Sequence, residues 1–402
     1  MSFFLRMLLL ALPAILLIYV YVSRRFTDAI QQLTSWPHST LRRGKWLSIG
    51  FLLLYPVLLL LTTIFNVVTF SNALSSGQLW SKILFIFPFW IGLLVVVELV
   101  PLLLTVDLAR LLLWPFYKKH QALWSKSQAW VTVILGAVIG IYVPARIWHD
   151  TYSLRLTQRA VKIPNLPEAL EGFRIVHLSD LQADLYTGAQ KMQLYIDLAN
   201  AQRPDLIVFS GDLVTRGTEH ITAGAQMMGR LRARLGVYAC LGDHDYWANP
   251  QLVAQQLQAN QVLVLEDSVL SLAANQISLT ILTNVYNRRP SPVTLARLRQ
   301  QRNDNAAVHL VLSHQPSGEL IQFAQKNGYH LLLAGHTHGG QVVFKPFGIP
   351  LSASHMETQY YSGFYQVGDL LLSVTNGLGL TFAPFRYQAP AEVTLILLTR
   401  QS

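Results

Sequence analysis

Five short polar clusters stand in the second half of the chain, and each follows an apolar run with the character of a β-strand. In order they are Asp180-Leu181-Gln182, Gly211-Asp212, Gly242-Asp243-His244-Asp245, Ser313-His314 and Gly335-His336-Thr337-His338-Gly339-Gly340. Carboxylates, an amide and imidazoles suit a pair of divalent metal ions, with a carboxylate bridging the ions and histidines completing each coordination shell. The donor set predicts metal-assisted hydrolysis of a phosphate ester.

Strand signals place these clusters in space. The preceding runs are short and rich in Val, Ile and Leu, and each ends where its polar group begins: Phe173–Leu178, Leu206–Phe209, Val237–Leu241, Val308–Leu312 and His330–Ala334. Continuous apolar runs suit strands buried on both faces, and layered α/β folds bind ligands beyond the carboxyl ends of such strands. We therefore expect the clusters to converge on one edge.

The order of the clusters resembles the calcineurin-like metallophosphoesterase family, whose signature runs D-x-H, G-D, G-N-H-D/E, H and G-H-x-H. The resemblance covers roughly Ile163 to Leu398. The stretches Gly335–Gln341, Asn376–Gly379 and Pro390–Glu392 resemble its membrane-associated bacterial branch. The resemblance implies a metal-dependent phosphoric ester hydrolase of phosphodiesterase type. It also implies a four-layer α-β-β-α sandwich, with two facing mixed sheets flanked by helices.

The same resemblance implies a role for each matching residue. One divalent ion would be held by Asp180, Gln182, Asp212 and His338, and a second by Asp212, Asp243, His314 and His336, with Asp212 bridging. Such ions lie about 3.5–4 Å apart, activate water and clamp the phosphoryl oxygens. His244 would stabilise phosphoryl charge or donate a proton on the leaving-group side, and Asp245 could accept its other ring N–H.

Two positions depart from the family pattern. Gln182 stands where histidine is usual, and an amide oxygen is a harder, weaker donor than an imidazole nitrogen. This favours Mn²⁺ or Mg²⁺ over Zn²⁺, with Fe²⁺ a further alternative, and a branch acting on ADP-ribose-type pyrophosphates also resembles the chain in having Gln there. Asp243 stands where asparagine is usual, so its extra charge should tighten the cation and lower its Lewis acidity.

Simpler readings apply to single clusters, because a lone Gly-Asp is a turn and a lone His-x-His is often structural. The five clusters in the family's order favour the metal site. Other polar residues are expected to be structural. His177 is expected in the core or behind the site, and His309, His330 and His355 are expected to be structural. Asp184 and Asn284 lie near plausible edges of the site, where a role in turns is the simpler interpretation.

The first 150 residues contain four long apolar segments: Phe4–Val22, Trp46–Phe70, Ile83–Thr105 and Ala129–Ile147. Each is near the roughly 20 residues needed to cross a hydrocarbon core about 30 Å thick. They predict a bundle of about four transmembrane helices, in which Leu108–Phe116 could be an interfacial extension. The first segment could be a signal peptide, but Arg24-Arg25 and the missing small-residue cleavage site favour a retained anchor.

Basic residues in the loops predict an orientation. They gather between the first two spans at Arg24, Arg25, Arg42, Arg43 and Lys45, and between the last two at Arg110, Lys118, Lys119 and Lys126. By the positive-inside rule these loops face the cytoplasm, although Arg155, Arg159 and Lys162 after the last span count against it. We expect a multi-pass protein of the bacterial inner (plasma) membrane, with the catalytic domain periplasmic or extracytoplasmic.

The expected organisation is a transmembrane region at 1–150, a linker at 151–166 and the metallophosphoesterase domain at 167–402. Further helices are expected at His220–Leu235, Leu252–Gln258 and Pro292–Gln300, and the strands Leu370–Val374 and Val393–Thr399 are expected to complete the second sheet. The net charge of +10 does not predict a nucleic-acid partner, because much of it flanks the membrane segments. The single Cys240 excludes an intrachain disulfide.

Three hypotheses on function follow. The first is a membrane-anchored phosphoesterase that acts on a phosphodiester or pyrophosphate, with a lipid-linked substrate as one version. The second is a catalytically weakened metal-binding sensor or scaffold on a membrane anchor, which the Gln182 departure favours. The third is a membrane carrier with an accessory soluble domain. The sequence predicts the lipid bilayer and a phosphate ester or pyrophosphate as partners, and no oligomeric state.

Overall fold

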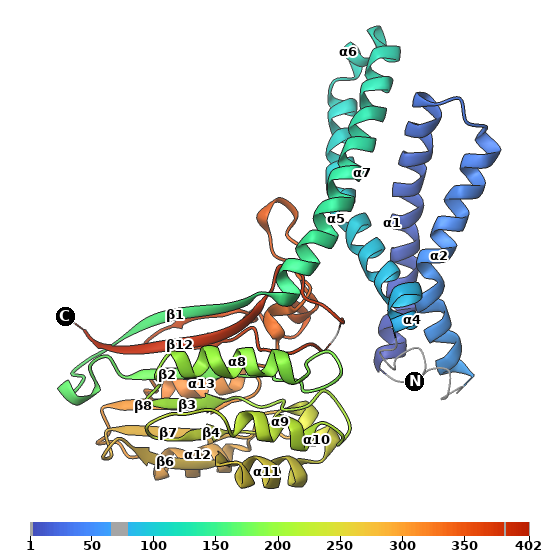
Figure 1. Ribbon diagram of the computed structural model, residues 1–402. Helices are drawn as coiled ribbons and strands as arrows, with labels where there is room; N and C mark the ends of the chain where they lie inside the picture. Colours follow the sequence, from blue (N-terminus) through green and yellow to red (C-terminus); the bar gives the residue numbers. More distant parts are fainter. Residues whose placement is uncertain (1–2, 66–78, 382, 402) are drawn as a thin grey trace. The chain divides into compact units, whose positions relative to one another are not determined.

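Long apolar helices make up most of the N-terminal part of the chain, and a pair of β-sheets makes up the rest (Figure 1). The structure is a computed structural model that describes residues 3–65, 79–381 and 383–401. The chain divides into two units, Met1–Arg146 with Phe344–Ile349, and Ile147–Val343 with Pro350–Ser402.

Within the described residues, four helices are long and apolar enough to cross a membrane, as the sequence predicted. The spans are Leu10–Leu33, His38–Thr62, Lys82–Leu112 and Gln121–Tyr152. The helices of this region are α1 (Phe3–Leu33), α2 (His38–Ile64), α4 (Leu79–Ser81), the π-helical η1 (Lys82–Ile86), α5 (Phe87–Leu112), α6 (Trp114–Lys119) and α7 (Gln121–Tyr152). Residues 66–70 of the second predicted span lie outside the described residues.

Most side chains of these helices face away from protein. Between 11% and 28% of the residues in each span are buried, and large apolar side chains such as Leu47, Leu111 and Ile141 are mostly exposed. Apolar surface of this extent is stable where lipid tails replace water, because helices satisfy their own backbone hydrogen bonds. The four helices therefore indicate membrane association.

Two basic residues lie in a helix rather than in the loop where we expected them. Arg24 and Arg25 belong to α1, which continues to Leu33. Arg25 forms an ion pair of 3.1 Å with Asp107 of α5, and the Tyr21 hydroxyl donates to the same carboxylate at 2.7 Å. Because Asp107 neutralises Arg25 within the helices, this charge carries no weight in the loop count that predicts orientation.

The second unit is built on two sheets of six strands each, counted over its described residues. The first sheet has the order β1-β12-β2-β3-β4-β5, and the second β10-β11-β9-β8-β7-β6. The strands of the first sheet are β1 (Leu154–Ile163), β12 (Ala391–Arg400), β2 (Arg174–Leu178), β3 (Leu206–Phe209), β4 (Val237–Ala239) and β5 (Val262–Val264). Those of the second are β10 (Gly363–Val367), β11 (Leu370–Val374), β9 (Leu331–Ala334), β8 (Val308–Ser313), β7 (Ile277–Leu282) and β6 (Ser268–Leu272).

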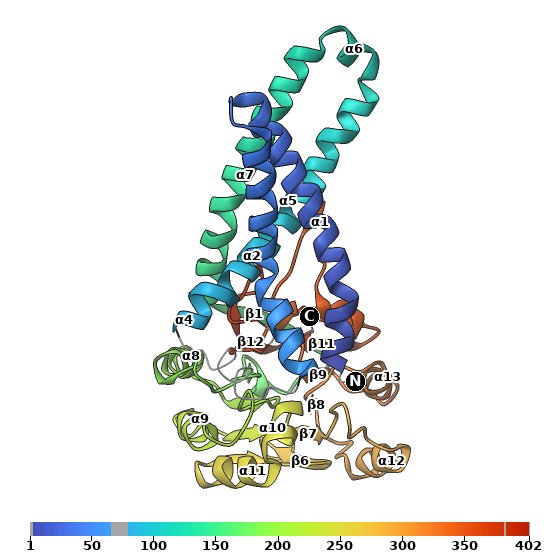
Figure 2. The ribbon, with the colours of Figure 1, turned by 90° about the vertical axis from the view of Figure 1, so that its right-hand side faces the viewer.

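Helices cover the outer faces of both sheets (Figure 2). On the first sheet lie α8 (Ala189–Ala201), α9 (Ile221–Met228) and α11 (Pro250–Ala259), and on the second lie α12 (Pro292–Gln301) and α13 (Gly318–Lys326). Each interface has its own apolar cluster, and a third cluster fills the space between the sheets. The four-layer α-β-β-α sandwich is confirmed.

Three local expectations were wrong. The expected linker 151–166 contains the end of α7 and strand β1, which pairs in parallel with β12 along its whole length. Most residues of β1 are exposed and polar residues interrupt its apolar ones, so no apolar run marked it as a strand. Strand β12 lies in the first sheet, antiparallel to β2, and not in the second. Helix α9 ends at Met228 because Gly229 follows, well before Leu235.

Parallel strands bring the polar clusters to one edge of the sandwich. Strands β2, β3 and β4 run parallel in the first sheet, and β7, β8 and β9 run parallel in the second. The clusters follow the carboxyl ends of β2, β3, β4, β8 and β9. The remaining short helices are η2 (Glu168–Leu170), α10 (Asp243–Ala248), η3 (His338–Gly340), η4 (Pro346–Gly348) and η5 (Ala353–Met356).

Candidate metal centre

The backbone adopts an unusual conformation at most of the candidate ligands. Positive φ angles occur at Asp180 (52°), Gln182 (49°), Asp212 (61°), His336 (71°) and His338 (52°). Left-handed backbone is uncommon for residues other than glycine and costs on the order of 1–3 kcal/mol for each residue, so it persists where the surrounding fold enforces it. Here it turns the chain sharply after β2, β3 and β9, which aims the side chains at a common point.

Two glycines allow the loops to approach closely. A Cβ atom on Gly242 would collide with the carboxylate of Asp212, and one on Gly335 would collide with Ser179 and with the carboxylate of Asp180. Glycine is therefore required at both places, because any side chain would occupy the space of a candidate ligand.

The first group of candidate ligands consists of Asp180, Asp212 and His338, which offer ligand atoms all within 4.8 Å of one another. The Nε2 atom of His338 lies 3.2 Å from Oδ1 of Asp180. All three side chains are buried. Burial lowers the pKa of His338, which favours the neutral imidazole that binds a metal ion.

Gln182 lies beside this first group. Its amide nitrogen donates to Oδ2 of Asp212 at 2.9 Å and lies 3.5 Å from Nε2 of His338. A metal ion would bind the amide oxygen and not the nitrogen. Gln182 can therefore act as a ligand only after its amide group rotates by half a turn, which exchanges the positions of the two atoms.

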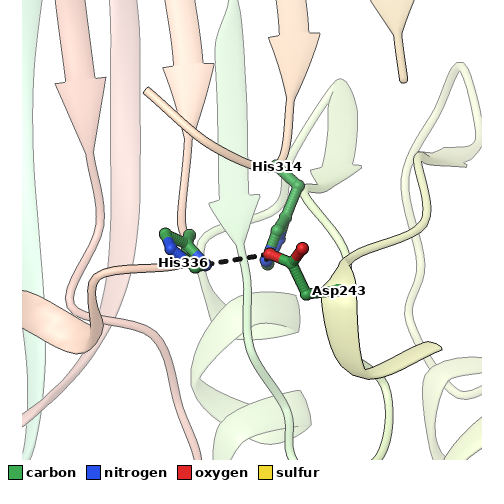
Figure 3. Close-up of side chains that lie close together, drawn as sticks. All are labelled: Asp243, His314 and His336. Atoms are coloured by element: carbon green, nitrogen blue, oxygen red, sulfur yellow. Dashed lines mark ion pairs between the residues drawn. The ribbon is translucent and has the colours of Figure 1, made fainter. Parts of the chain in front are cut away.

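The second group consists of Asp243, His314 and His336, which point toward one another from α10, the end of β8 and the loop after β9 (Figure 3). Oδ2 of Asp243 lies 3.1 Å from Nδ1 of His336 and 3.3 Å from Nε2 of His314. Burial alone would raise the pKa of Asp243, but the two histidines so close to it hold this pKa well below its usual range.

Asp212 connects the two groups. Its Oδ2 atom, which accepts from Gln182 on the first side, lies 3.4 Å from Nε2 of His314 in the second group. Burial raises the pKa of Asp212 to about 6, with the neighbouring carboxylates adding to the effect. A carboxylate so placed gains most from cations on both sides.

His244 and Asp245 do not contact each other through the ring, so the expected His244–Asp245 hydrogen bond is wrong. The Nδ1 atom of His244 bonds with the Thr215 carbonyl, and its Nε2 atom lies 3.2 Å from the Thr381 hydroxyl. Asp245 instead accepts from the backbone N–H groups of Asp212 and Leu213, both at 2.8 Å. Neighbouring residues on a helix point in different directions, and Asp245 turns back to bond with Gly242 at the helix start.

Several supporting residues were missed in the sequence. Glu357 accepts from Nε2 of His336 at 3.0 Å, the Tyr286 backbone N–H donates to Asp243 at 2.7 Å, and the Gln315 amide donates to the same carboxylate. Gln315 directly follows a candidate ligand, so its position was the one available signal. Glu357 and Tyr286 come from distant loops, and nothing local indicated them.

A buried arginine supports the loop that carries His338. The Arg386 side chain is 1% exposed. It donates to the backbone carbonyls of His338, Asn376, Gly377, Gly379 and Ala389 at 2.7–3.2 Å. Burial lowers its pKa to about 10, and the carbonyl oxygens offset part of the cost of burying the charge.

The other histidines and the turn residues lie outside the two groups. His177 is buried and bonds with Ser210 at 2.9 Å, while His309 and His330 stack on each other and His355 bonds with Ser352. Asp184 accepts from two backbone N–H groups in its turn. Asn284 donates to the Gln315 carbonyl at 2.7 Å.

The donor atoms fit divalent cations. Within the described part of the chain, Nε2 of His314 is buried and makes no hydrogen bond of good geometry, although it lies 3.4 Å from Asp212 and 3.3 Å from Asp243. A buried polar atom left unsatisfied costs about 1–3 kcal/mol. A cation that binds this nitrogen and the carboxylates beside it would explain the arrangement, since carboxylate and imidazole donors suit Mn²⁺, Fe²⁺ and Zn²⁺.

Comparisons with known proteins agree with this geometry. The profile described as calcineurin-like phosphoesterase matches residues 173–340. The metallophosphoesterase YkuE of Bacillus subtilis (strain 168) is 30% identical over 258 residues, which cover 62% of this chain and 87% of that protein. The transmembrane protein with metallophosphoesterase domain of Danio rerio is 26% identical, with 68% of this chain and 63% of that protein covered. Phosphodiesterase YaeI of Escherichia coli (strain K12) is 26% identical, with 56% of this chain and 81% of that protein covered.

The chain belongs to the calcineurin-like metallophosphoesterase family, whose members include transmembrane proteins.

Proposed function

We propose that this protein is a membrane-anchored phosphoesterase that uses two divalent metal ions to hydrolyse a phosphodiester or a pyrophosphate. The family hydrolyses phosphoesters with divalent metals. The position of the Asp212 carboxylate supports the two-metal form most directly, because one of its oxygens faces both groups of candidate ligands. A single-metal site would not require a shared carboxylate between two histidine-containing groups.

Each ion has a candidate ligand set in this proposal. Asp180, Gln182, Asp212 and His338 would hold the first ion, and Asp212, Asp243, His314 and His336 the second. When bound, the ions supply Lewis-acid activation of water and of the phosphoryl group. Mn²⁺ is our choice of metal, because the Gln182 oxygen and two carboxylates make the first set rich in oxygen.

His244 would manage charge and protons beside the ions. The Thr215 carbonyl fixes its Nδ1 atom, so the ring presents Nε2, which lies 4.0 Å from Oδ2 of Asp212. From there His244 would stabilise the phosphoryl oxygens or protonate the leaving group. Asp245 would act differently from our first expectation, by holding the backbone of Asp212 in its left-handed conformation.

A metal-binding sensor or scaffold without turnover is the second candidate. One observation favours it: the amide nitrogen of Gln182, rather than its oxygen, faces Asp212. If the Gln182 amide stays in this orientation, the first ion has one ligand fewer. An ion that is held more weakly would activate water and the phosphoryl group less. Metal stoichiometry and turnover together separate the two functions.

The test uses the full-length protein in detergent. A fragment that starts at Ile163 would lack most of β1, which pairs with β12 in the first sheet. We expect hydrolysis of one class in a panel of phosphomonoesters, phosphodiesters and pyrophosphates, including lipid-linked ones. Activity should be lost on chelation and restored best by Mn²⁺. Turnover that survives rigorous metal removal would contradict the proposal, and two bound ions without turnover would favour the sensor.

The orientation in the membrane is a separate part of the proposal. We propose that the catalytic unit lies in the periplasm or outside the cell, which would exclude cytoplasmic substrates. Reporter fusions test this orientation at three positions: after Ser76, after Gln121 and after Ser402. Ser76 and Ser402 lie outside the described residues. Alkaline phosphatase should be active at Ser76 and Ser402 and silent at Gln121. The opposite pattern would place the site in the cytoplasm.

A further inference from the structure

Two exposed aromatic rings stand beside the candidate metal centre. The Trp247 side chain is 57% exposed, and that of Tyr286 is 43% exposed. Aromatic rings of this size are normally buried or used in binding, since exposing them to water forgoes their hydrophobic stabilisation. The position of two exposed rings beside the candidate ligands indicates a role in binding.

The two rings lie nearly parallel to each other, and each lies beside a histidine of the site. Their planes differ by 4° and their centroids lie 6.4 Å apart. The Trp247 ring lies 4.8 Å from that of His244, and the Tyr286 ring lies 5.2 Å from that of His336. Tyr286 is held at both ends, because its backbone N–H donates to Asp243 and its hydroxyl to Glu357.

Two arginines, Arg288 and Arg289, follow Tyr286 closely in the same loop. The guanidinium of Arg288 lies 5.0 Å from the centre of the Tyr246 ring, next to Trp247 in sequence, and Arg289 donates to Asn284 at 2.8 Å. Both arginines are exposed. Parallel aromatic faces together with arginines are the combination that stacks planar bases and holds their phosphates. An acyl chain would gain nothing from the parallel ring planes or from the two cations.

We propose that Trp247 and Tyr286 form a stacking subsite for a planar aromatic group attached to the scissile phosphate, as in a nucleoside phosphate or an aryl phosphate ester. This assignment rests on the proposed function, because it names the class of substrate for the same centre. His244 and His336 would then lie between the stacked ring and the reacting phosphorus. The exposed Arg288 and Arg289, in the loop of Tyr286, would attract the phosphate charge.

The test measures binding, so that it does not depend on turnover. Equilibrium dialysis of the full-length protein in detergent with Mn²⁺ compares AMP, inorganic phosphate and a single-chain lysophosphatidic acid. The parent should bind AMP more tightly than phosphate. Trp247→Ala should weaken AMP binding on the order of 10-fold and leave phosphate binding unchanged. Trp247→Phe and Tyr286→Phe should keep most of the affinity, because both retain a ring.

Two results would overturn the subsite. One is an equal affinity of the parent for AMP and phosphate, and the other is a loss in Trp247→Ala that affects lysophosphatidic acid but not AMP, which would indicate an acyl-chain surface. Leu194→Ala on α8, whose side chain is 59% exposed, is the control for removing exposed apolar surface. Absence of turnover in the parent, with AMP discrimination intact, would contradict the proposed function and leave the subsite standing.

Discussion

The two groups of candidate ligands lie next to each other but are held in place by different means. In the first, Asp180, Gln182, Asp212 and His338 all adopt left-handed backbone. In the second, His336 alone does so, and hydrogen bonds from other side chains and loops fix the ligands. Asp243 accepts from the Tyr286 backbone and the Gln315 amide, and Nδ1 of His314 bonds with the Ser210 carbonyl at 2.7 Å.

This difference also appears in exposure. The His338 side chain is 3% exposed, whereas that of His336 is 14% exposed and contacts Glu357, which is 47% exposed. The first group is thus enclosed and set by the fold of the backbone. In the second group His336 is the more exposed residue and lies beside the Tyr286 ring, so we propose that a substrate enters from this side. Substitutions should therefore act differently in the two groups.

Asp212→Ala should have the largest effect, because it alone serves both groups. We expect bound metal to fall from two ions toward none and turnover to fall below detection. Metal content by mass spectrometry after dialysis, together with circular dichroism, measures this in the full-length protein. Asp197→Ala on α8, a carboxylate bonded to Gln193, should keep both ions. Loss of one ion only in Asp212→Ala would show that the carboxylate does not bridge.

His244→Ala should reduce turnover by a factor on the order of 10² to 10⁴, the usual contribution of a general acid. Bound metal should stay at the parental level, because the backbone N–H of residue 244, and not the imidazole, bonds with Asp212 at 2.8 Å. The measurement pairs steady-state kinetics with metal analysis. Metal loss equal to that of Asp212→Ala would mean that His244 is a ligand.

Glu357→Gln should weaken the second group alone. The carboxylate fixes Nε2 of His336, and removing such a partner of a ligating histidine typically costs 10–100-fold in metal affinity. Titration with a fluorescent chelator should then resolve one ion with parental affinity and one held more weakly. Glu319→Gln in the first turn of α13 is the control. A weaker first ion would contradict the separate support of the two groups.

The sequence predicted the parts of this site that depend on local pattern. Apolar runs and the polar residues after them located strands such as β3 and candidate ligands such as Asp212. Contacts made by distant loops, such as those of Glu357 with His336 and of Tyr286 with Asp243, left no local signal. Strand β1 was missed because its partner β12 is distant in the sequence and because polar residues interrupt its apolar ones. Left-handed φ at residues other than glycine cannot be read from residue type.

Gln182→His should have the smallest effect of these substitutions. It tests the first group of candidate ligands, which left-handed backbone holds in place. The side chain is fully buried against Asp212 and His338, and an imidazole adds a nitrogen donor where an amide offers oxygen. Nitrogen favours Zn²⁺ over Mn²⁺, so the ratio of bound Zn²⁺ to Mn²⁺ in the first group should rise on the order of 10-fold. Dialysis against equal concentrations of both ions, followed by mass spectrometry, measures this ratio.

The control for Gln182→His is Gln255→His on the exposed face of α11, which should leave the ratio unchanged. The second group should keep its preference, because its donors are untouched. A ratio that shifts for both ions would mean that Asp212 transmits the change between them. An unchanged ratio would mean that residue 182 is not a ligand, and its amide would then act only by donating to the Asp212 carboxylate, as it does at 2.9 Å.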